Sequence, residues 1–303
     1  MQIVLAERTE HSVELLCELM SVTSSSYYRW VQTDHQGIRS IEDQQLKEKI
    51  KAIHEGSRKI YGSPRIEKSL RKAGVKTSKK RVLRLMKEQG LKGCYNERKR
   101  PETTDSKHGN RISNNFLKGR DFPTRPKEVV VVDTTYLWTD SGWHYLATVM
   151  DLFNREIVGW SFSSNNDRHL VCQALWNASG EFSDDELIMH HSDRGSTYCS
   201  DEYRKLLDEL GMVSSMSAKG YCYDNAHMES FFGSLKSECR ELDESLSAAQ
   251  VKLVLFDYIE GFYNTHRIHT ALGSMSPREY RQSYGSPRGA AIGFDINESN
   301  ESK

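Results

Sequence analysis

The chain has 303 residues, which is enough for two domains, one of them with a full-sized hydrophobic core. It has no signal peptide and no apolar run of membrane-spanning length, so we expect a cytoplasmic protein with no membrane partner. The six cysteines show neither CxxC nor zinc-finger spacing, and we expect them to be reduced thiols rather than zinc ligands or disulfides.

The formal net charge is zero, with 42 basic and 42 acidic side chains, but the charge is unevenly distributed. Residues 58–120 contain 20 Lys and Arg against 5 Asp and Glu, a net charge of +15. Residues 1–57 have a net charge of −3, and residues 121–303 have a net charge of −12. A basic block beside an acidic domain predicts that the basic part binds a polyanion and that the acidic part has a different function. The simpler alternative is a solvated basic surface.

Residues 1–57 are expected to form an N-terminal helical segment. The stretch 12–31 has helical apolar spacing at Val13, Leu16 and Leu19, followed by a break rich in Ser and Thr. A second short helix is predicted over residues 41–55, with isoleucines and a leucine along one side.

Residues 58–96 show the pattern of a helix-turn-helix DNA-binding domain. Pro64 suits a first helical turn, Gly74 ends that helix, and Thr77 or Ser78 can cap the next one. The second helix carries cations that could contact DNA phosphates or a groove: Lys79, Lys80, Arg81, Arg84 and Lys87. Helical hairpins also occur in proteins that do not bind DNA. Residues 97–127 read as an extended, basic linker.

After Lys127 the sequence becomes rich in β-branched residues. Strands and helices are expected in the order strand 128–138, strand 143–152, strand 155–163, helix 167–179, strand 187–193, helix 200–210, strand 212–218 and a last helix that begins near residue 223. The first three strands predict an antiparallel meander. The whole order predicts an α/β domain with a mixed sheet, over residues 128–284 together with C-terminal helices.

The helix in "YDNAHMESFFGSLKSE" has an apolar stripe with polar residues at its border. Glu229 lies beside the stripe, Asn225 is one turn before it, and Lys236 is two turns after it. Lys236 is a candidate for contact with a phosphodiester, and Asn225 could orient the substrate or a carboxylate.

Two aspartates are associated with predicted strands. Asp133 lies in the downstream part of a buried strand, where an unpaired carboxylate is unfavourable, and Asp193 follows the fourth strand directly. Glu229 on the last helix completes the set, with 59 and 35 residues between successive acids. Each acid alone could cap a turn or form an ion pair. Together they predict a site for two Mg²⁺ ions, for which Mn²⁺ can substitute, that would promote an in-line displacement at phosphorus.

Four segments carry a family resemblance: "VVDTTYL", "HSDRGSTY", "KGYCYDNAHMESFFGSLKSE" and "YNTHRIHTALGSMSPREY". Together they resemble the catalytic domain shared by retroviral integrases and bacterial insertion-sequence transposases, and are most similar to the insertion sequence 3 family. The resemblance covers roughly residues 12–284. One difference follows Gly195, where the family often continues Ser-Gln-Tyr and this chain has Ser196, Thr197 and Tyr198.

The resemblance implies a ribonuclease H-like fold in which Asp133, Asp193 and Glu229 form the metal-binding catalytic triad and Lys236 contacts DNA. It implies a bacterial DNA transposase that acts on double-stranded element ends and targets, associates with the nucleoid and works as a homo-oligomer. The chain has no sustained heptad repeat and resembles the catalytic reading frame, so an upstream-frame partner or fusion is expected.

Two other functions stay open on the sequence: a DNA-binding regulator with an inert catalytic fold, and a ribonuclease H-type nuclease. In "YNTHRIHTAL", Arg267 and the histidines are expected to lie on phosphate or backbone rather than to act as ligands or bases. The polar, Gly-rich tail 285–303 is expected to be disordered.

Overall fold

The computed structural model describes residues 1–32, 38–94, 113–117, 119, 121–182, 187–217, 226–243 and 245–284. The chain divides into two compact units, Met1–Gly93 and Cys94–Lys303. The tail 285–303, Asn225 and most of the basic part of the expected linker lie outside the described residues. Within the described residues, no helix is both long enough and apolar enough to cross a membrane.

The first unit begins with three short helices, α1 (Gln2–Glu7), α2 (Val13–Leu19) and α3 (Ser24–Gln32). Ser12 caps α2, because its hydroxyl accepts a hydrogen bond from the backbone N–H of Leu15. The buried side chains of Val4, Leu16 and Tyr27 lie in their common core. The prediction of helices within 12–31 is confirmed, whereas α1, which buries only Val4, was not predicted.

Three further helices form the helix-turn-helix region: α4 (Ile38–Gly56), α5 (Ser63–Lys72) and α6 (Lys79–Glu88). Gly74, with a φ of 78°, follows the end of α5, and the Ser78 hydroxyl caps α6. The predicted helix-turn-helix is therefore confirmed. Helix α4 packs against both α5 and α6, so the boundary expected after residue 57 separates α4 from its packing partners.

The second unit is built on a five-stranded mixed sheet in the order β3-β2-β1-β4-β5. Its strands are β1 (Val129–Thr139), β2 (Gly142–Asp151), β3 (Ile157–Ser163), β4 (Met189–Ser192) and β5 (Val213–Met216). The first three are antiparallel, β4 runs parallel to β1, and β5 runs parallel to β4. The predicted antiparallel meander and mixed sheet are both confirmed.

Strand β1 has unequal neighbours along its length. It pairs with β2 from Val130 to Thr139, but it pairs with β4 only from Val129 to Val131. Downstream of Val131, no strand among the described residues pairs with the β4 side of β1, and this is where the candidate site lies.

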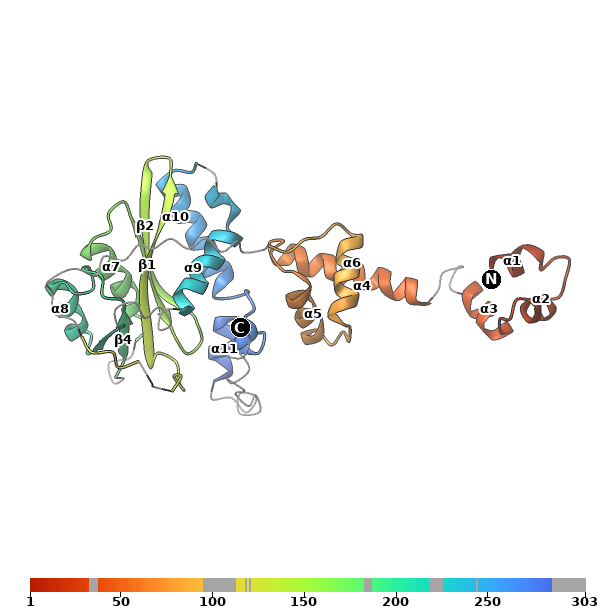
Figure 1. The fold of residues 1–303 in the computed structure, drawn as a ribbon, viewed down its shortest axis with the longest axis horizontal. Coiled ribbons are helices and arrows are strands. Elements are labelled where there is room, and N and C mark those ends of the chain that lie inside the picture. The colour runs from red at the N-terminus through yellow and green to blue at the C-terminus, as the bar shows by residue number, and fades with distance from the viewer. Residues whose placement is uncertain are drawn as a thin grey trace. The chain divides into compact units, whose positions relative to one another are not determined.

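Helices cover both faces of the sheet (Figure 1). Helices α7 (Arg168–Ser179) and α8 (Asp201–Glu209) lie on one side, and α9 (Ala226–Glu238), α10 (Ala248–Phe256) and α11 (Pro277–Ser283) lie on the other. Helix α7 approaches β3 closely at Gly159, where a Cβ atom would lie 2.5 Å from the carbonyl oxygen of Ala174. Only glycine fits this contact.

The C-terminal part of the second unit is tied to the sheet by an amide. Helix α10 continues into the π-helix η3 (Asp257–Tyr263), and the fully buried Asn264 follows it. The Asn264 side chain accepts a hydrogen bond from the backbone N–H of Ile157 and donates one to the carbonyl of Ile157, both at 2.9 Å. This side chain therefore fixes the segment after η3 to the start of β3.

Candidate functional site

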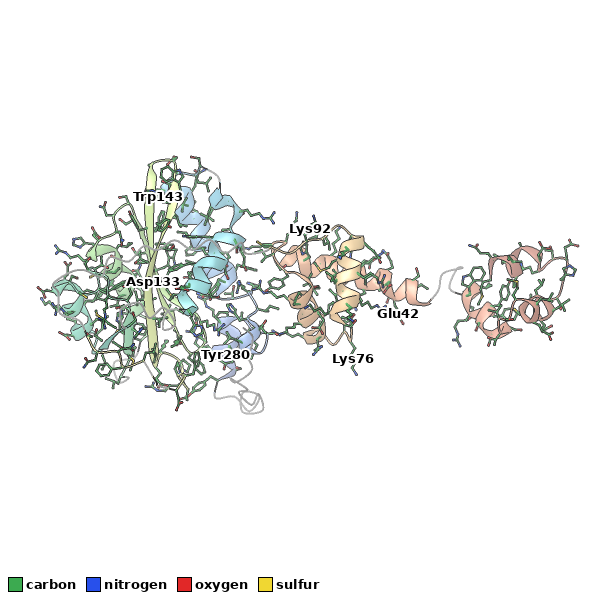
Figure 2. The ribbon with its side chains drawn as sticks, viewed as in Figure 1. Glu42, Lys76, Lys92, Asp133, Trp143 and Tyr280 are labelled. Carbon is green, nitrogen blue, oxygen red and sulfur yellow. The ribbon has the colours of Figure 1, made fainter. Side chains whose placement is uncertain are left out.

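The two candidate aspartates lie at equivalent positions beside neighbouring parallel strands, Asp133 within β1 and Asp193 just after β4. The last registered pair between β1 and β4 is Val131 with His191, and Asp133 and Asp193 each lie two residues further along the chain. Because parallel strands run in the same direction, both aspartates lie beyond the point where β1 and β4 separate. Figure 2 shows Asp133 near the middle of the sheet.

Backbone groups orient both carboxylates. The N–H of Thr134 donates to Oδ1 of Asp133, and the N–H of Gly195 donates to Oδ1 of Asp193, each at 2.8 Å. The loop after Asp193 is held in turn by Arg194, whose Nε donates to the carbonyl oxygen of Ser217 at 2.8 Å. These hydrogen bonds restrict the rotation of each carboxylate.

Tyr198 lies between the two aspartate-bearing segments. Its side chain is buried, and its hydroxyl lies 2.9 Å from the hydroxyl of Thr134 on β1. Burial, and then the negative charges of Asp133 and Asp193, raise the pKa of Tyr198 well above its ordinary value. Both carboxylates are therefore within electrostatic range of this phenol, which stays protonated at neutral pH. No role was predicted for Tyr198 from the sequence; its place five residues after Asp193 was the available signal.

Helix α9 carries the third candidate acid and the candidate DNA-contacting lysine. The predicted apolar stripe is buried, at Met228, Phe231, Phe232 and Leu235. Glu229 is exposed in the first turn. Lys236 follows two turns later, and its Nζ lies 4.5 Å from the centroid of the Tyr136 ring on β1. Desolvation lowers the pKa of Lys236, although part of the side chain stays exposed.

The oxygen ligands of Asp133 and Asp193 suit a hard divalent cation such as Mg²⁺, and both residues lie just beyond the paired part of β1 and β4. Over the residues that the structure describes, no group of three or more His, Cys, Asp or Glu side chains is arranged to bind a metal ion. The strand register places the two aspartates at equivalent positions on β1 and just after β4, and Glu229 lies on α9, which packs against β1. Residues 218–225, immediately before α9, lie outside the described part of the chain.

Arg267 was expected to lie on DNA phosphate or backbone, and the structure corrects this expectation. The Arg267 and Glu238 side chains are only 6% and 5% exposed. The Arg267 Nε and Nη2 atoms donate to the two carboxylate oxygens of Glu238, each at 2.7 Å, and Nη2 also donates to the Ser234 hydroxyl. Although burial disfavours its charged form, the hydrogen bonds with Glu238 raise the pKa of Arg267. The guanidinium thus binds the C-terminal turns of α9 rather than facing a ligand.

The paired histidines before Asp193 are buried in β4, at 0% and 2% exposure for His190 and His191. The Nε2 atom of His190 lies 2.8 Å from the hydroxyl of Tyr203, and burial lowers the pKa of His190 to about 3. His190 is therefore neutral at physiological pH. His190 and His191 are thus buried side chains of strand β4.

The candidate DNA-contacting cations of α6 fall into two groups. Lys79, Lys80 and Lys87 are exposed. Arg81 and Arg84 instead pair with acids, mainly on α4: Arg81 with Asp43 at 2.8 Å and Glu42 at 3.2 Å, and Arg84 with Asp43 at 2.5 Å and Glu88 at 2.6 Å. In this structure the acidic side of α4 therefore takes the position that a phosphate would need at these two arginines.

Comparisons with known families assign both parts of the chain. Two models, each described as an integrase core domain, match residues 123–222 and 229–284. A third, described as an HTH-like domain, matches residues 41–100. Together with the sheet topology, these matches confirm the predicted fold class, a ribonuclease H-like mixed sheet preceded by an all-α helix-turn-helix region.

Two relatives are similar over most of their length. The "insertion element IS600 uncharacterized 31 kDa protein" of Shigella sonnei is 38% identical over 275 residues, which cover 89% of this chain and 98% of the relative. "Transposase InsF for insertion sequence IS3A" of Escherichia coli strain K12 is 35% identical over 274 residues, which cover 90% and 95% of the two chains.

Two solved structures resemble the chain at low identity. One is the HTLV-2 integrase catalytic core domain in complex with magnesium, in its trimeric form, with a TM-score of 0.42, 14% identity, and coverage of 52% of this chain and 98% of that chain. The other is a simian T-cell lymphotropic virus intasome in complex with PP2A regulatory subunit B56 gamma, with a TM-score of 0.46, 12% identity, and coverage of 78% and 75%.

Proposed function

This chain belongs to the insertion sequence 3 family of transposases, and from that premise we propose that it cuts DNA at the ends of an insertion sequence and joins the freed ends to a second phosphodiester. The observation that carries the proposal is the pair Asp133 and Asp193, each two residues beyond the last pair between β1 and β4, within the integrase core match. The acidic pair supplies the oxygen ligands that phosphoryl transfer by divalent metal ions requires.

Asp133, Asp193 and Glu229 would bind two Mg²⁺ ions, for which Mn²⁺ can substitute. When bound, the ions activate an attacking oxygen and stabilise the leaving oxygen of an in-line displacement. The backbone N–H groups of Thr134 and Gly195 hold the aspartate carboxylates in a fixed orientation. Tyr198 keeps β1 next to the loop after β4 through its contact with Thr134. These residues preorganise the site.

Cleavage and joining are the same chemical step performed twice in one site. Water attacks a phosphodiester at the element end and frees a 3′-hydroxyl, and this hydroxyl then attacks a second phosphodiester. No covalent bond between protein and DNA is required, so no Ser or Tyr nucleophile is assigned. Lys236 would place its ammonium near the phosphodiester backbone, and Asn225 would orient the substrate.

The α4–α6 region would bind the double-stranded ends of the element. Lys79, Lys80 and Lys87 are exposed and can approach phosphates directly. Arg81 and Arg84 could join them only if they exchanged the acids on α4 and α6 for phosphates. We also propose that the protein works in the bacterial cytoplasm as a homo-oligomer on DNA, together with an upstream-frame partner or fusion.

The test is a cleavage and joining assay on labelled DNA that carries the ends of the element encoding this chain. It would compare Mg²⁺ with EDTA, and the wild type with the Asp193→Asn and Glu229→Gln variants. Asp208→Asn, which removes an exposed carboxylate from α8, is the matched control. We expect joined products with Mg²⁺ that disappear with EDTA and in both site variants but persist in the control.

An Asp193→Asn variant that still cuts would contradict the metal site. If the wild type binds the ends in a salt-sensitive manner but yields no product, adding the upstream-frame protein decides between a missing partner and an inert regulator. Faster cleavage of RNA–DNA hybrids than of DNA ends would instead indicate a ribonuclease H-type nuclease.

A further inference from the structure

The hairpin formed by β1 and β2 carries a cluster of aromatic rings near its turn. Trp138 and Trp143 face each other across the two strands, and their ring centroids are 4.9 Å apart in an edge-to-face arrangement. Tyr136 contacts the same Trp143 ring edge-to-face at 5.0 Å. Figure 2 shows Trp143 near the end of the hairpin, well beyond Asp133. We call Tyr136, Trp138 and Trp143 the aromatic platform.

The two tryptophans are exposed, although their strands are otherwise well packed. Trp138 is 54% exposed and Trp143 is 52% exposed. The adjacent cross-strand pair, Leu137 with His144, points to the other face of the hairpin and is buried at 4% and 9% exposure. One face of the hairpin therefore packs on the protein while the other presents large rings to solvent. Exposed apolar surface of this kind marks a binding site.

A positive charge borders the aromatic platform. The Lys236 Nζ atom, which comes from α9, lies 4.5 Å from the centroid of the Tyr136 ring. An ammonium group beside exposed aromatic rings matches the two parts of a nucleotide, because the rings can stack on the base while the cation attracts the phosphate. An apolar protein segment would match the rings, but it would provide no negative charge for this ammonium group.

The aromatic platform continues from the candidate catalytic site along a single strand. Tyr136 is three residues beyond Asp133 on β1, and Trp138 is five residues beyond it. At the usual rise of a strand, these separations are about 10 Å and about 17 Å. Because residues an odd number apart point to opposite faces of a strand, Tyr136 and Trp138 face away from the side of Asp133. A DNA strand whose phosphodiester lies at Asp133 would reach the platform by passing the β4-side edge of β1, where pairing with β4 ends at Val131.

We propose that Tyr136, Trp138 and Trp143 stack on unpaired bases of the DNA strand beside the phosphodiester that is cut, with Lys236 on the adjoining phosphate. The proposal rests on the proposed function and adds the form of its substrate: a DNA end with a few bases separated from their partners. Bases inside a duplex stack on each other and do not offer a free face to the rings. Stacking is tolerant of sequence because every base has such a face.

The experiment measures binding of the full chain to two DNA ends in EDTA, so that no cutting occurs. One end is fully paired, and the other carries three unpaired terminal bases, one of them 2-aminopurine, whose fluorescence falls when it stacks. The variants are Trp138→Ala, Trp143→Ala and Trp138→Phe, the last of which keeps a ring. Trp176→Ala is the control, because Trp176 is 59% exposed on α7 and lies outside the platform.

We expect each platform Trp→Ala variant to bind the unpaired end about tenfold more weakly, equivalent to about 1.4 kcal/mol, and to lose most of the 2-aminopurine quenching. Trp138→Phe should retain most of both, and Trp176→Ala all of both. Binding of the fully paired end should be little changed. Thermal unfolding of each variant checks that the fold persists.

The platform proposal would be overturned if every variant bound each DNA end with wild-type affinity. It would also be overturned if the Trp→Ala variants lost the same affinity for the paired end as for the unpaired end. A change of self-association in sedimentation, without a change in DNA binding, would overturn it too and would indicate a protein interface. Cutting by the wild type in Mg²⁺ is scored separately. If the wild type cuts DNA but the Trp variants bind normally, the platform is wrong and the proposed function stands. If stacking depends on the tryptophans but the wild type does not cut, the platform stands and the proposed function is wrong.

Discussion

The two compact units use arginine in opposite environments. In the first unit, Arg81 and Arg84 lie on α6, with side chains 30% and 52% exposed, and pair with acids that are themselves partly exposed. In the second unit, Arg267 is 6% exposed and binds both carboxylate oxygens of Glu238. All three arginines were predicted from the sequence to contact DNA. Their surroundings in the structure now distinguish the two exposed arginines from the buried one.

The exposed and the buried ion pairs differ in how readily the arginine can change partners. An exposed ion pair contributes little net stability, because water and salt compensate either charge when the pair opens. A buried ion pair leaves a desolvated charge behind when one partner is removed. Arg81 and Arg84 can therefore exchange carboxylates for phosphates. Arg267 instead stays paired with Glu238 and stabilises the position of α9, the helix that carries Glu229.

The largest expected effect is on Arg267. Replacing it with Ala should lower the free energy of unfolding by about 3–5 kcal/mol, because Glu238 stays buried without its partner. Urea denaturation of the wild type and the variant measures the difference. The double variant Arg267→Met with Glu238→Leu should recover much of the loss, since it leaves no unpaired charge. An Arg267→Ala variant of unchanged stability that binds DNA with a weaker salt dependence would restore the DNA-contact role.

Burial also makes the stability of the second unit depend on pH, through Asp151 at the end of β2. Burial raises the pKa of Asp151 from 3.8 to about 7, against the opposing effect of hydrogen bonds from the backbone N–H groups of Lys127 and Phe153. The folded protein therefore binds this proton more tightly than the unfolded chain. The free energy of unfolding should fall as pH rises from about 4 to about 7, by up to about 4 kcal/mol for this group alone.

Calorimetry of the wild type and Asp151→Asn at several pH values measures that slope. The difference between the two slopes isolates Asp151 from the other titrating groups. Asp43 in the first unit should act in the opposite direction, because its hydrogen bond with Arg84 lowers its pKa and its contribution is lost only as pH falls. An identical slope in the wild type and Asp151→Asn would show that Asp151 is ionised in the fold.

Periodicity and turn residues were sufficient to predict all five strands and the helices from α5 to α9. The β-branched run that begins at Val129 and the alternating strands after it carry strong local signals. The partners of single charged side chains could not be predicted in this way. Arg267 and Glu238 are 29 residues apart in the chain, and Asp43 and Arg84 are 41 apart, so only the packed structure brings them together.

The same limit applies to the candidate site. The spacing and resemblance predicted Asp133, Asp193 and Glu229 as a set, and the structure shows why the two aspartates are neighbours: β1 and β4 are adjacent and parallel. Tyr198 was not given a role, because its contact with Thr134 depends on the loop after β4 folding back to β1. The aromatic platform was not predicted either, since alternation along a strand does not reveal which face is left uncovered.

The smallest expected effect tests whether the exposed arginines can change partners. Asp43→Ala removes the acid that Arg81 and Arg84 share, and we expect affinity for the element ends to rise by about three- to fivefold at low salt, on the scale of a surface charge interaction. The dependence of log affinity on log salt should steepen by about one to two, as the released guanidiniums take up phosphates. Glu48→Ala is the matched control, because it removes an exposed acid from the same helix. Fluorescence anisotropy across a salt series measures both quantities. If both variants raise affinity equally with unchanged slopes, the effect is one of net charge, and Arg81 and Arg84 serve only to hold α4 against α6.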